Sequence, residues 1–204
     1  PILPGLQPAA VTSVQVTPAG SLEIRANRKG SDWQVVKPII YPAQPAAISA
    51  LLDALQKLTV ATRINAADIR ENHQTDADFG FDPPQCSIVI ESGSQRWQLR
   101  VGHKTPPGDQ VYLRVVGVDG AFVADAGWLK FIPGSANDWR DTALVDTADT
   151  ECDSIVITNN ARSIELWRDP TNHLWQMLRP LRARANNARI TDALQQLRTA
   201  SITN

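Results

Sequence analysis

Histidine and cysteine are the residue types of this chain that most often bind metal ions or act as nucleophiles. The three histidines are His73, His103 and His173, and no two have the spacing that would bring them onto one helix face or one hairpin as metal ligands. His73 lies in a polar, acidic stretch, which is more typical of a solvated loop than of a cation site. We therefore expect no bound metal and no cofactor.

The two cysteines, Cys86 and Cys152, are too few for a disulfide framework. They would form one bridge in an oxidising compartment if the fold brought them together, and the alternative is two small buried residues at the starts of strands. No neighbouring group is placed to activate either thiol as a nucleophile. Because the chain also lacks a nucleophile elbow, a Walker loop and a dinucleotide fingerprint, we expect that it is not an enzyme.

Four arginines form a basic cluster late in the chain. They are Arg179, Arg182, Arg184 and Arg189. Such a cluster is a candidate contact for an anionic partner or for phospholipid headgroups. A solvated face without a partner has the same appearance in a sequence, so both interpretations stay open.

The most irregular segment of the chain covers residues 103–109. Its polar members His103, Lys104 and Asp109 are candidate loop contacts, because binding residues are often carried on loops of this kind. The alternative is a long, rigid hairpin connection, and we favour that structural interpretation.

The sequence that surrounds these candidate residues contains an internal repeat. Residues 21–58 match residues 142 positions later without a gap, and residues 13–17 match residues 154–158 at a separation of 141. The matched pairs include Trp33 with Trp175, Pro38 with Pro180, Ala43 with Ala185, Ile48 with Ile190, Leu52 with Leu194 and Leu55 with Leu197. We expect Trp33, Pro38, Trp175 and Pro180 to be structural anchors of two copies of one unit.

The periodicity of each copy predicts three strands followed by a helix. Val14 and Val16 alternate with polar neighbours, as in half-buried strands, and proline ends the third strand. Ile48 and Leu52 fall on the apolar face of a helix that has Pro45 in its first turn. The predicted fold class is α+β, with two β-β-β-α repeats and mainly antiparallel sheets flanking a β-rich middle segment.

The middle segment contains two predicted hairpins, over residues 87–101 and 111–124, and a short helix near residues 128–131. Residues 65–78 are polar and are expected to form a connection. We therefore divide the chain into a first repeat at 11–65, a β-rich middle segment with a short helix at 66–150, and a second repeat at 151–204.

Together with the repeat, several short motifs resemble a known bacterial family. The motifs are Phe79-Gly80-Phe81-Asp82-Pro83-Pro84, Val101-Gly102-His103-Lys104-Thr105-Pro106-Pro107-Gly108, Val111-Tyr112-Leu113-Arg114 and Asp138-Trp139-Arg140-Asp141. Their order and spacing resemble the family catalogued as domain of unknown function 4340, over almost the whole chain. The resemblance implies a protein anchored by one membrane helix upstream of this chain and exposed on the periplasmic side of the cytoplasmic membrane. It also implies a link, in some members, to ABC transport components of the gliding-motility type, and it assigns no catalytic residues.

The charge balance narrows the choice of partners. The chain has 20 Lys+Arg and 21 Asp+Glu, which gives no overall field to attract nucleic acid. We expect a non-catalytic extracytoplasmic interaction or scaffold module, whose partner is another protein of a membrane assembly and whose oligomeric state stays open. The alternative is a ligand-binding domain, for example for a glycan, with a cleft between the repeats.

The two repeats differ in the segments after their helices. Residues 59–64 are rich in β-branched residues and predict an extended segment after the first helix, whereas the second copy offers only residues 201–204. We therefore expect that the second repeat is truncated and that the chain is a fragment of a longer protein.

Overall fold

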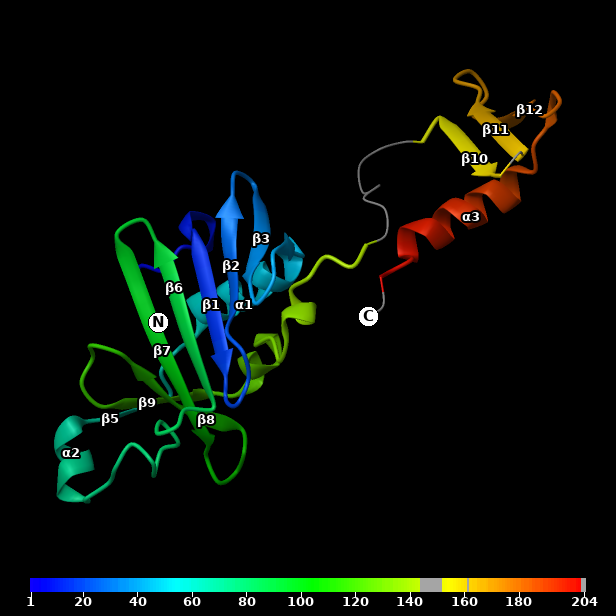
Figure 1. Ribbon diagram of the computed structural model, residues 1–204. Helices are drawn as coiled ribbons and strands as arrows, with labels where there is room; N and C mark the ends of the chain where they lie inside the picture. The colour runs from blue at the N-terminus through cyan, green and yellow to red at the C-terminus, as the bar shows by residue number, and fades with distance from the viewer. Residues whose placement is uncertain (144–151, 161, 203–204) are drawn as a thin grey trace. The chain divides into compact units, whose positions relative to one another are not determined.

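The computed structural model describes residues 1–143, 152–160 and 162–202 (Figure 1). The chain divides into two compact units, Pro1–Asp141 and Thr142–Asn204. Both units combine antiparallel sheets with helices, so the chain is an α+β protein.

The first unit, all of whose residues are described, is built on a nine-stranded antiparallel sheet. In spatial order its strands are β4 (Tyr41–Pro42), β3 (Asp32–Lys37), β2 (Ile24–Lys29), β1 (Ser13–Pro18), β6 (Cys86–Ser92), β7 (Gln95–Lys104), β8 (Gln110–Val115), β9 (Ala121–Asp125) and β5 (Thr62–Ile64). Its helices are the 3₁₀ helices η1 (Pro8–Ala10), η2 (Gly127–Phe131) and η3 (Ala136–Asp138) and the α-helices α1 (Pro45–Lys57) and α2 (Ala66–Glu71).

Helix α1 packs on the apolar face of this sheet. Val14 and Val16 of β1 are fully buried and Gln15 between them is not, because successive side chains of a strand point to opposite faces. The helix begins at Pro45, whose fixed φ suits a first turn. Its apolar stripe consists of Ile48, Leu51, Leu52 and Leu55, all buried. The predicted strand and helix patterns are therefore correct for this part of the chain.

The middle segment joins the same sheet. β6 pairs with β1, and the two predicted hairpins are β6–β7 and β8–β9. Ile88 and Ile90 of β6 lie in one core with α1. The division expected between residues 65 and 66 therefore falls inside a single unit. The physical reason is that β1 would otherwise leave an apolar edge and part of the core uncovered.

Residues 65–78 are more ordered than a plain connection. They contain α2, which has no buried residue, so its polar sequence gave no apolar stripe to recognise. Directly before it, β5 pairs with β9 at the far edge of the sheet. Phe79 and Phe81 then pack with Ala121 in a second, smaller core.

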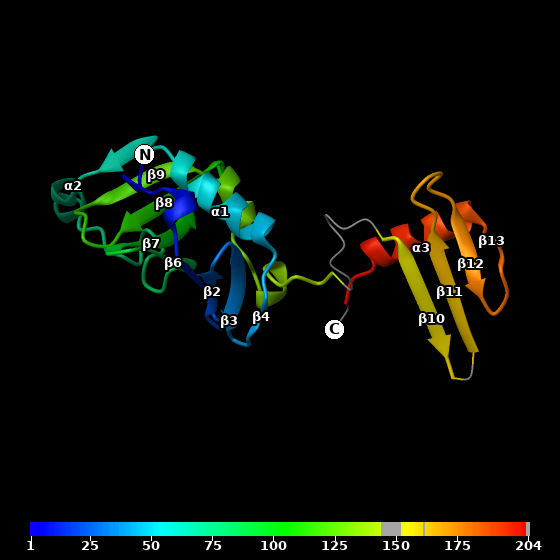
Figure 2. The ribbon, with the colours of Figure 1, turned by 90° about the horizontal axis from the view of Figure 1, so that it is seen from above.

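The second unit has a four-stranded antiparallel sheet among its described residues, with a helix against one face (Figure 2). The strands, in spatial and chain order, are β10 (Ser154–Asn159), β11 (Arg162–Arg168), β12 (Trp175–Arg179) and β13 (Ala183–Arg184), and the helix is α3 (Asn187–Thr199). The side chain of Asn186 caps α3 by accepting a hydrogen bond from the backbone N–H of Arg189.

Each sheet contains a short strand that the sequence did not predict. The third strands end at Lys37 and Arg179, directly before Pro38 and Pro180, and both peptide bonds to these prolines are cis. After each proline the chain turns back into a two-residue strand, β4 or β13, that pairs with the third strand. Two residues are too few to show an alternating pattern. Within the described ranges, the helices are too short or too polar to cross a membrane.

Candidate functional site

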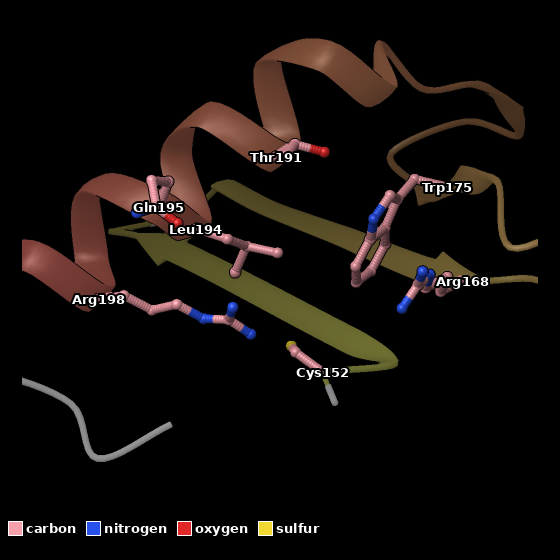
Figure 3. Close-up of a pocket in the computed structure, with 7 residues that line it drawn as sticks. All are labelled: Cys152, Arg168, Trp175, Thr191, Leu194, Gln195 and Arg198. Atoms are coloured by element: carbon pink, nitrogen blue, oxygen red, sulfur yellow. The ribbon is translucent and has the colours of Figure 1, made fainter. Parts of the chain in front are cut away.

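A pocket of about 270 Å³ lies between α3 and the sheet of the second unit (Figure 3). It is lined by Cys152, Arg168, Trp175, Thr191, Leu194, Gln195 and Arg198. Cys152 lies just before β10, and Arg168 and Trp175 face each other across β11 and β12. The other four residues belong to α3.

The helical spacing of these four residues explains why they share the pocket. Thr191, Leu194, Gln195 and Arg198 occupy positions i, i+3, i+4 and i+7, which form one face of an α-helix. Leu194 is half-buried and the other three are exposed. Figure 3 shows Leu194 pointing toward the side of Trp175, and Arg198 extending along the pocket toward Cys152.

The described lining of the pocket carries positive charge. It contains two guanidinium groups and no carboxylate. Arg168 is held in place in part by its Nε, which donates to the backbone carbonyl of His173 at 3.2 Å. Trp175, only 5% exposed, supplies an apolar wall. The arrangement suits a small group with carboxylate, phosphate or carbonyl oxygens and an apolar part.

The two cysteines lie in different surroundings. Both are free, so the single bridge considered from the sequence is not formed. The thiol of Cys152 donates to the backbone carbonyl of Ser154 at 3.2 Å, and the described lining of its pocket holds no imidazole or carboxylate to serve as a base. Cys86 is buried, and burial raises its pKa to about 12.

The four arginines expected to form a contact surface do not line the pocket. All four are exposed. Arg179 ends β12 and places its Nε 3.3 Å from a carboxylate oxygen of Glu165, Arg182 lies in the turn after this strand, Arg184 belongs to β13, and Arg189 lies in the first turn of α3. The fold brings Arg168 and Arg198 to one pocket instead. Neither stood out in the sequence, although the i, i+4 spacing of Arg198 from Leu194 would have placed it on the pocket face of the helix.

The structure places two of the three candidate loop residues at one pocket and the third elsewhere. His103 and Lys104 end β7 and line a second pocket, of about 460 Å³, in the first unit. The remaining walls are Pro18, Gln85, Cys86, Val101, Gly102, Leu129, Ile132, Pro133 and Gly134. Asp109 is not among the lining residues, and its backbone carbonyl accepts a hydrogen bond from the N–H of Ala126 at 2.8 Å.

The connection after Lys104 is a short, hydrogen-bonded hairpin loop. The backbone N–H of Thr105 donates to the carbonyl of Gln110 at 2.9 Å, and Gly108 donates back to the carbonyl of Thr105 at 2.7 Å. Gly108 has a φ of +85°, a conformation that glycine adopts without steric cost. The segment is therefore a hairpin connection, as we favoured, but a short one and not the long one that we expected.

The acidic stretch around His73 is engaged within the first unit. The carboxylate of Asp78 accepts hydrogen bonds from the backbone N–H and the hydroxyl of Thr75, which hold its pKa below its ordinary value. Asp76 is ion-paired with Arg114. Across residues 1–143, 152–160 and 162–202, no three histidine, cysteine or acidic side chains are grouped so that they could hold a metal ion.

A comparison with known protein families gives a match over most of the chain. A family model described as Domain of unknown function (DUF4340) matches residues 33–204, which is well over half of the chain and includes the pocket of the second unit. No curated protein and no solved structure matches the chain.

Proposed function

The chain belongs to the family described as Domain of unknown function (DUF4340), and we propose that it is a non-catalytic interaction module whose second unit docks on another protein of a membrane assembly. An extracytoplasmic location and attachment through an N-terminal membrane segment are parts of this proposal. Both come from the family resemblance, as does an accessory role in transport.

The observation that carries the proposal is the apolar surface of the second unit. Its large exposed apolar side chains are Val156, Ile157, Ile164, Trp167, Leu174, Leu181, Leu197 and Ile202, and each is 38–60% exposed. Of the residues described in this unit, only Leu166 and Trp175 are buried apolar residues. So much exposed apolar surface on a small unit is typical of a surface that a partner covers.

The proposal includes a duplication, in which residues 13–58 and 154–200 are two copies of one unit. The order of four strands and a helix is the same in both. Matching backbone hydrogen bonds support it. Ala43 donates to the carbonyl of Trp33 at 3.0 Å, as Ala185 does to that of Trp175 at 3.2 Å. The second strand of each has a bulge in its pairing with the third.

The strand pairing corrects the sequence match of the two copies. Ala26 lies opposite Val35 in the first copy, and Leu166 lies opposite Met177 in the second. β2 therefore corresponds to β11 at a separation of 140, and the ungapped match is wrong by two residues in this strand. The cause is an exchange of turn lengths. The first turn is longer in the first copy and the second turn is longer in the second, so the total changes little.

With this correction, several exposed residues of the second unit are counterparts of buried ones in the first. The counterparts are Val16 (0% exposed) and Ile157 (51%), Ile24 (2%) and Ile164 (40%), and Leu55 (0%) and Leu197 (44%). The first unit covers these positions with the rest of its core. We propose that a partner protein covers the corresponding side chains of the second unit.

The proposal is tested by site-specific photo-cross-linking of the full-length protein in membranes of its native host. A photoreactive residue at Ile157 or Leu197 should give a discrete adduct with another protein. Val118, which is 41% exposed in the first unit, is a matched control and should give none. Absence of an adduct from both positions of the second unit would reject the docking function. Protease accessibility of the protein in intact spheroplasts tests the extracytoplasmic location.

A second candidate function, binding of a small ligand, is favoured by the pocket of Figure 3. In the first copy, the counterparts of its two arginines are Arg28 and Gln56, and both donate to backbone carbonyls of residues 6–9. These positions are therefore suited to bind oxygen acceptors. Titration calorimetry with sugar acids and other small carboxylates tests this candidate. Heat that is abolished by Arg198→Ala supports it, and no heat with any of them rejects it. The cleft between repeats suggested by the sequence stays a prediction.

A further inference from the structure

Strand β10 has an open edge among the described residues of the second unit. Its other edge is covered by β11 in a ladder of six pairs, from Ser154 opposite Trp167 to Asn159 opposite Arg162. The strand is apolar, with Val156 60% and Ile157 51% exposed. Apolar edges of this kind pair readily with an added strand, and most proteins cover or charge them.

The first unit shows how the corresponding edge is covered. β1, the counterpart of β10, pairs on that side with β6 over six residues, from Ser13 opposite Glu91 to Pro18 opposite Cys86. The facing pairs Val14–Ile90 and Val16–Ile88 are buried, with every member at most 1% exposed. An antiparallel strand with apolar residues at alternate positions therefore completes this unit.

The second unit offers the same positions to an added strand. Ile155 and Ile157 correspond to Val14 and Val16, so a strand like β6 would place its two alternate apolar residues opposite them. Val156 takes the place of Gln15, which lies opposite the buried Val89. β10 thus exposes an apolar side chain on each of its faces, Val156 on one and Ile157 on the other, as expected for a strand that lies inside a sheet.

We propose that β10 is the acceptor for an extended strand of the partner protein, which adds antiparallel to the sheet. The added segment has at least six residues with β-branched or other apolar side chains at alternate positions, as β6 has. Main-chain hydrogen bonds supply affinity in this mode of recognition, and the alternate side chains supply specificity. The inference rests on the proposed docking function and names the way in which the partner is held.

The register identifies the backbone groups that would receive the strand. Arg168 donates its backbone N–H to the carbonyl of Asp153 at 2.8 Å, so Asp153 faces β11. The backbone N–H and C=O groups of successive residues in an antiparallel strand point to opposite edges. Those of Ile155 and Ile157 therefore also point to β11, and those of Ser154, Val156 and Thr158 point to the open edge. Val156→Pro therefore removes an outward N–H and leaves the β11 ladder intact, since proline is tolerated at strand edges. Val156→Thr keeps the N–H and the branched side chain, and is the matched control.

The experiment uses the whole 204-residue chain and a labelled peptide with the sequence of residues 85–93 carrying Cys86→Ser. Fluorescence anisotropy should show saturable binding. Val156→Pro should weaken it by at least about tenfold, and Val156→Thr by less than about twofold, because only the former removes a ladder hydrogen bond and blocks the edge. A peptide with Ser87→Pro and Val89→Pro should not bind, because the N–H groups of these two residues face β1 in the sheet and would face β10 in the complex. Hydrogen exchange should show that the peptide protects the amides of Val156 and Thr158.

Each contrary result overturns the proposal. If the peptide does not bind, or if it binds the Val156→Pro variant as tightly as the unchanged chain, β10 is not an acceptor strand. A dimer of the chain that Val156→Pro dissociates assigns the edge to a second copy. Amides of β10 that are protected in the full-length protein before peptide is added assign the edge to another part of the same polypeptide. The docking function is judged separately: if the Ile157 adduct still forms in the Val156→Pro variant, docking stands and strand addition fails.

Discussion

The guanidinium carbon of Arg28 lies 4.9 Å from the ring centroid of Trp33, and the two residues face each other across β2 and β3. The same guanidinium donates to the carbonyls of Pro8 and Ala9 at 3.1 Å, so it joins the buried indole to the segment before β1. Arg168 and Trp175 face each other in the same way in the second unit. There the pair lines the pocket. The same pairing of an arginine with a tryptophan therefore contacts the chain itself in the first unit and an open pocket in the second.

Trp33→Ala should destabilise the first unit by about 3–5 kcal/mol, because the indole is 5% exposed and its removal leaves a cavity. Urea unfolding followed by circular dichroism measures the change. Trp167→Ala is the matched control, since Trp167 is 38% exposed and should cost less than about 1 kcal/mol. An unchanged free energy of unfolding for Trp33→Ala would show that the ring is not part of the core.

Gly102→Ala should destabilise the first unit by roughly 1–3 kcal/mol through overpacking. A Cβ at this position would lie 2.1 Å from the carbonyl oxygen of Phe79, which also accepts a hydrogen bond from the N–H of His103 at 2.9 Å. Gly134→Ala is the control, because the nearest atom to its Cβ would be 3.7 Å away, in Asp138. Thermal unfolding of both variants checks this, and equal melting temperatures would contradict the close packing.

The stability of the first unit should fall in alkaline solution because of Cys86. Burial raises the pKa of this thiol from 9.0 to about 12. Above pH 9 the thiol ionises in the unfolded chain but stays protonated in the folded one, so its contribution is full below pH 9 and is lost as the pH rises toward about 12. Cys86→Ala should show a smaller decrease in the free energy of unfolding over this range. Parallel curves for the two proteins would rule out the effect.

A matched pair of substitutions compares the two units. Val16→Ser should cost about 2–4 kcal/mol, because it empties a fully buried site and places a hydroxyl there. Ile157→Ser, at the position that the proposed duplication matches with Val16, should cost less than about 1 kcal/mol, since this side chain is 51% exposed. Hydrogen exchange of the β1 amides and of the β10 amides measures the stability of each unit separately. Equal losses would mean that β10 is covered in the chain by itself.

Local patterns in the sequence predicted most elements of both units. The alternation of Val14 and Val16 and the stripe that contains Ile48 and Leu52 report directly on burial, so strands and helix were found where they lie. The burial of Trp33 and Trp175 is confirmed for the same reason. The pairing of β1 with β6 was not predicted, because it joins Val14 to Ile90 across a long stretch of chain and no local pattern records a distant neighbour.

The candidate site was less predictable than the elements. Nearness in sequence suggested the cluster of Arg179, Arg182 and Arg184, whereas the pocket depends on the pairing of Arg168 with Trp175 and on the face of α3 that carries Arg198. In the proposed duplication Arg168 is the counterpart of Arg28, and the shifted register of β11 concealed this correspondence. Turn lengths decide such a register, and an ungapped comparison cannot detect two compensating changes.

The position of β6 beside β1 has a consequence for synthesis. Thr17 and Ser87 lie opposite each other in the sheet although they are 70 positions apart in the sequence, and the interval contains β2, β3, β4, α1, β5 and α2. A ribosome therefore delivers β1, β2, β3 and α1 well before the strand that completes them. Until β6 emerges, the nascent chain exposes the edge of β1, and transient edges of this kind invite mispairing with other chains. A nascent chain arrested after α2 should therefore bind a chaperone more strongly than one arrested after β6.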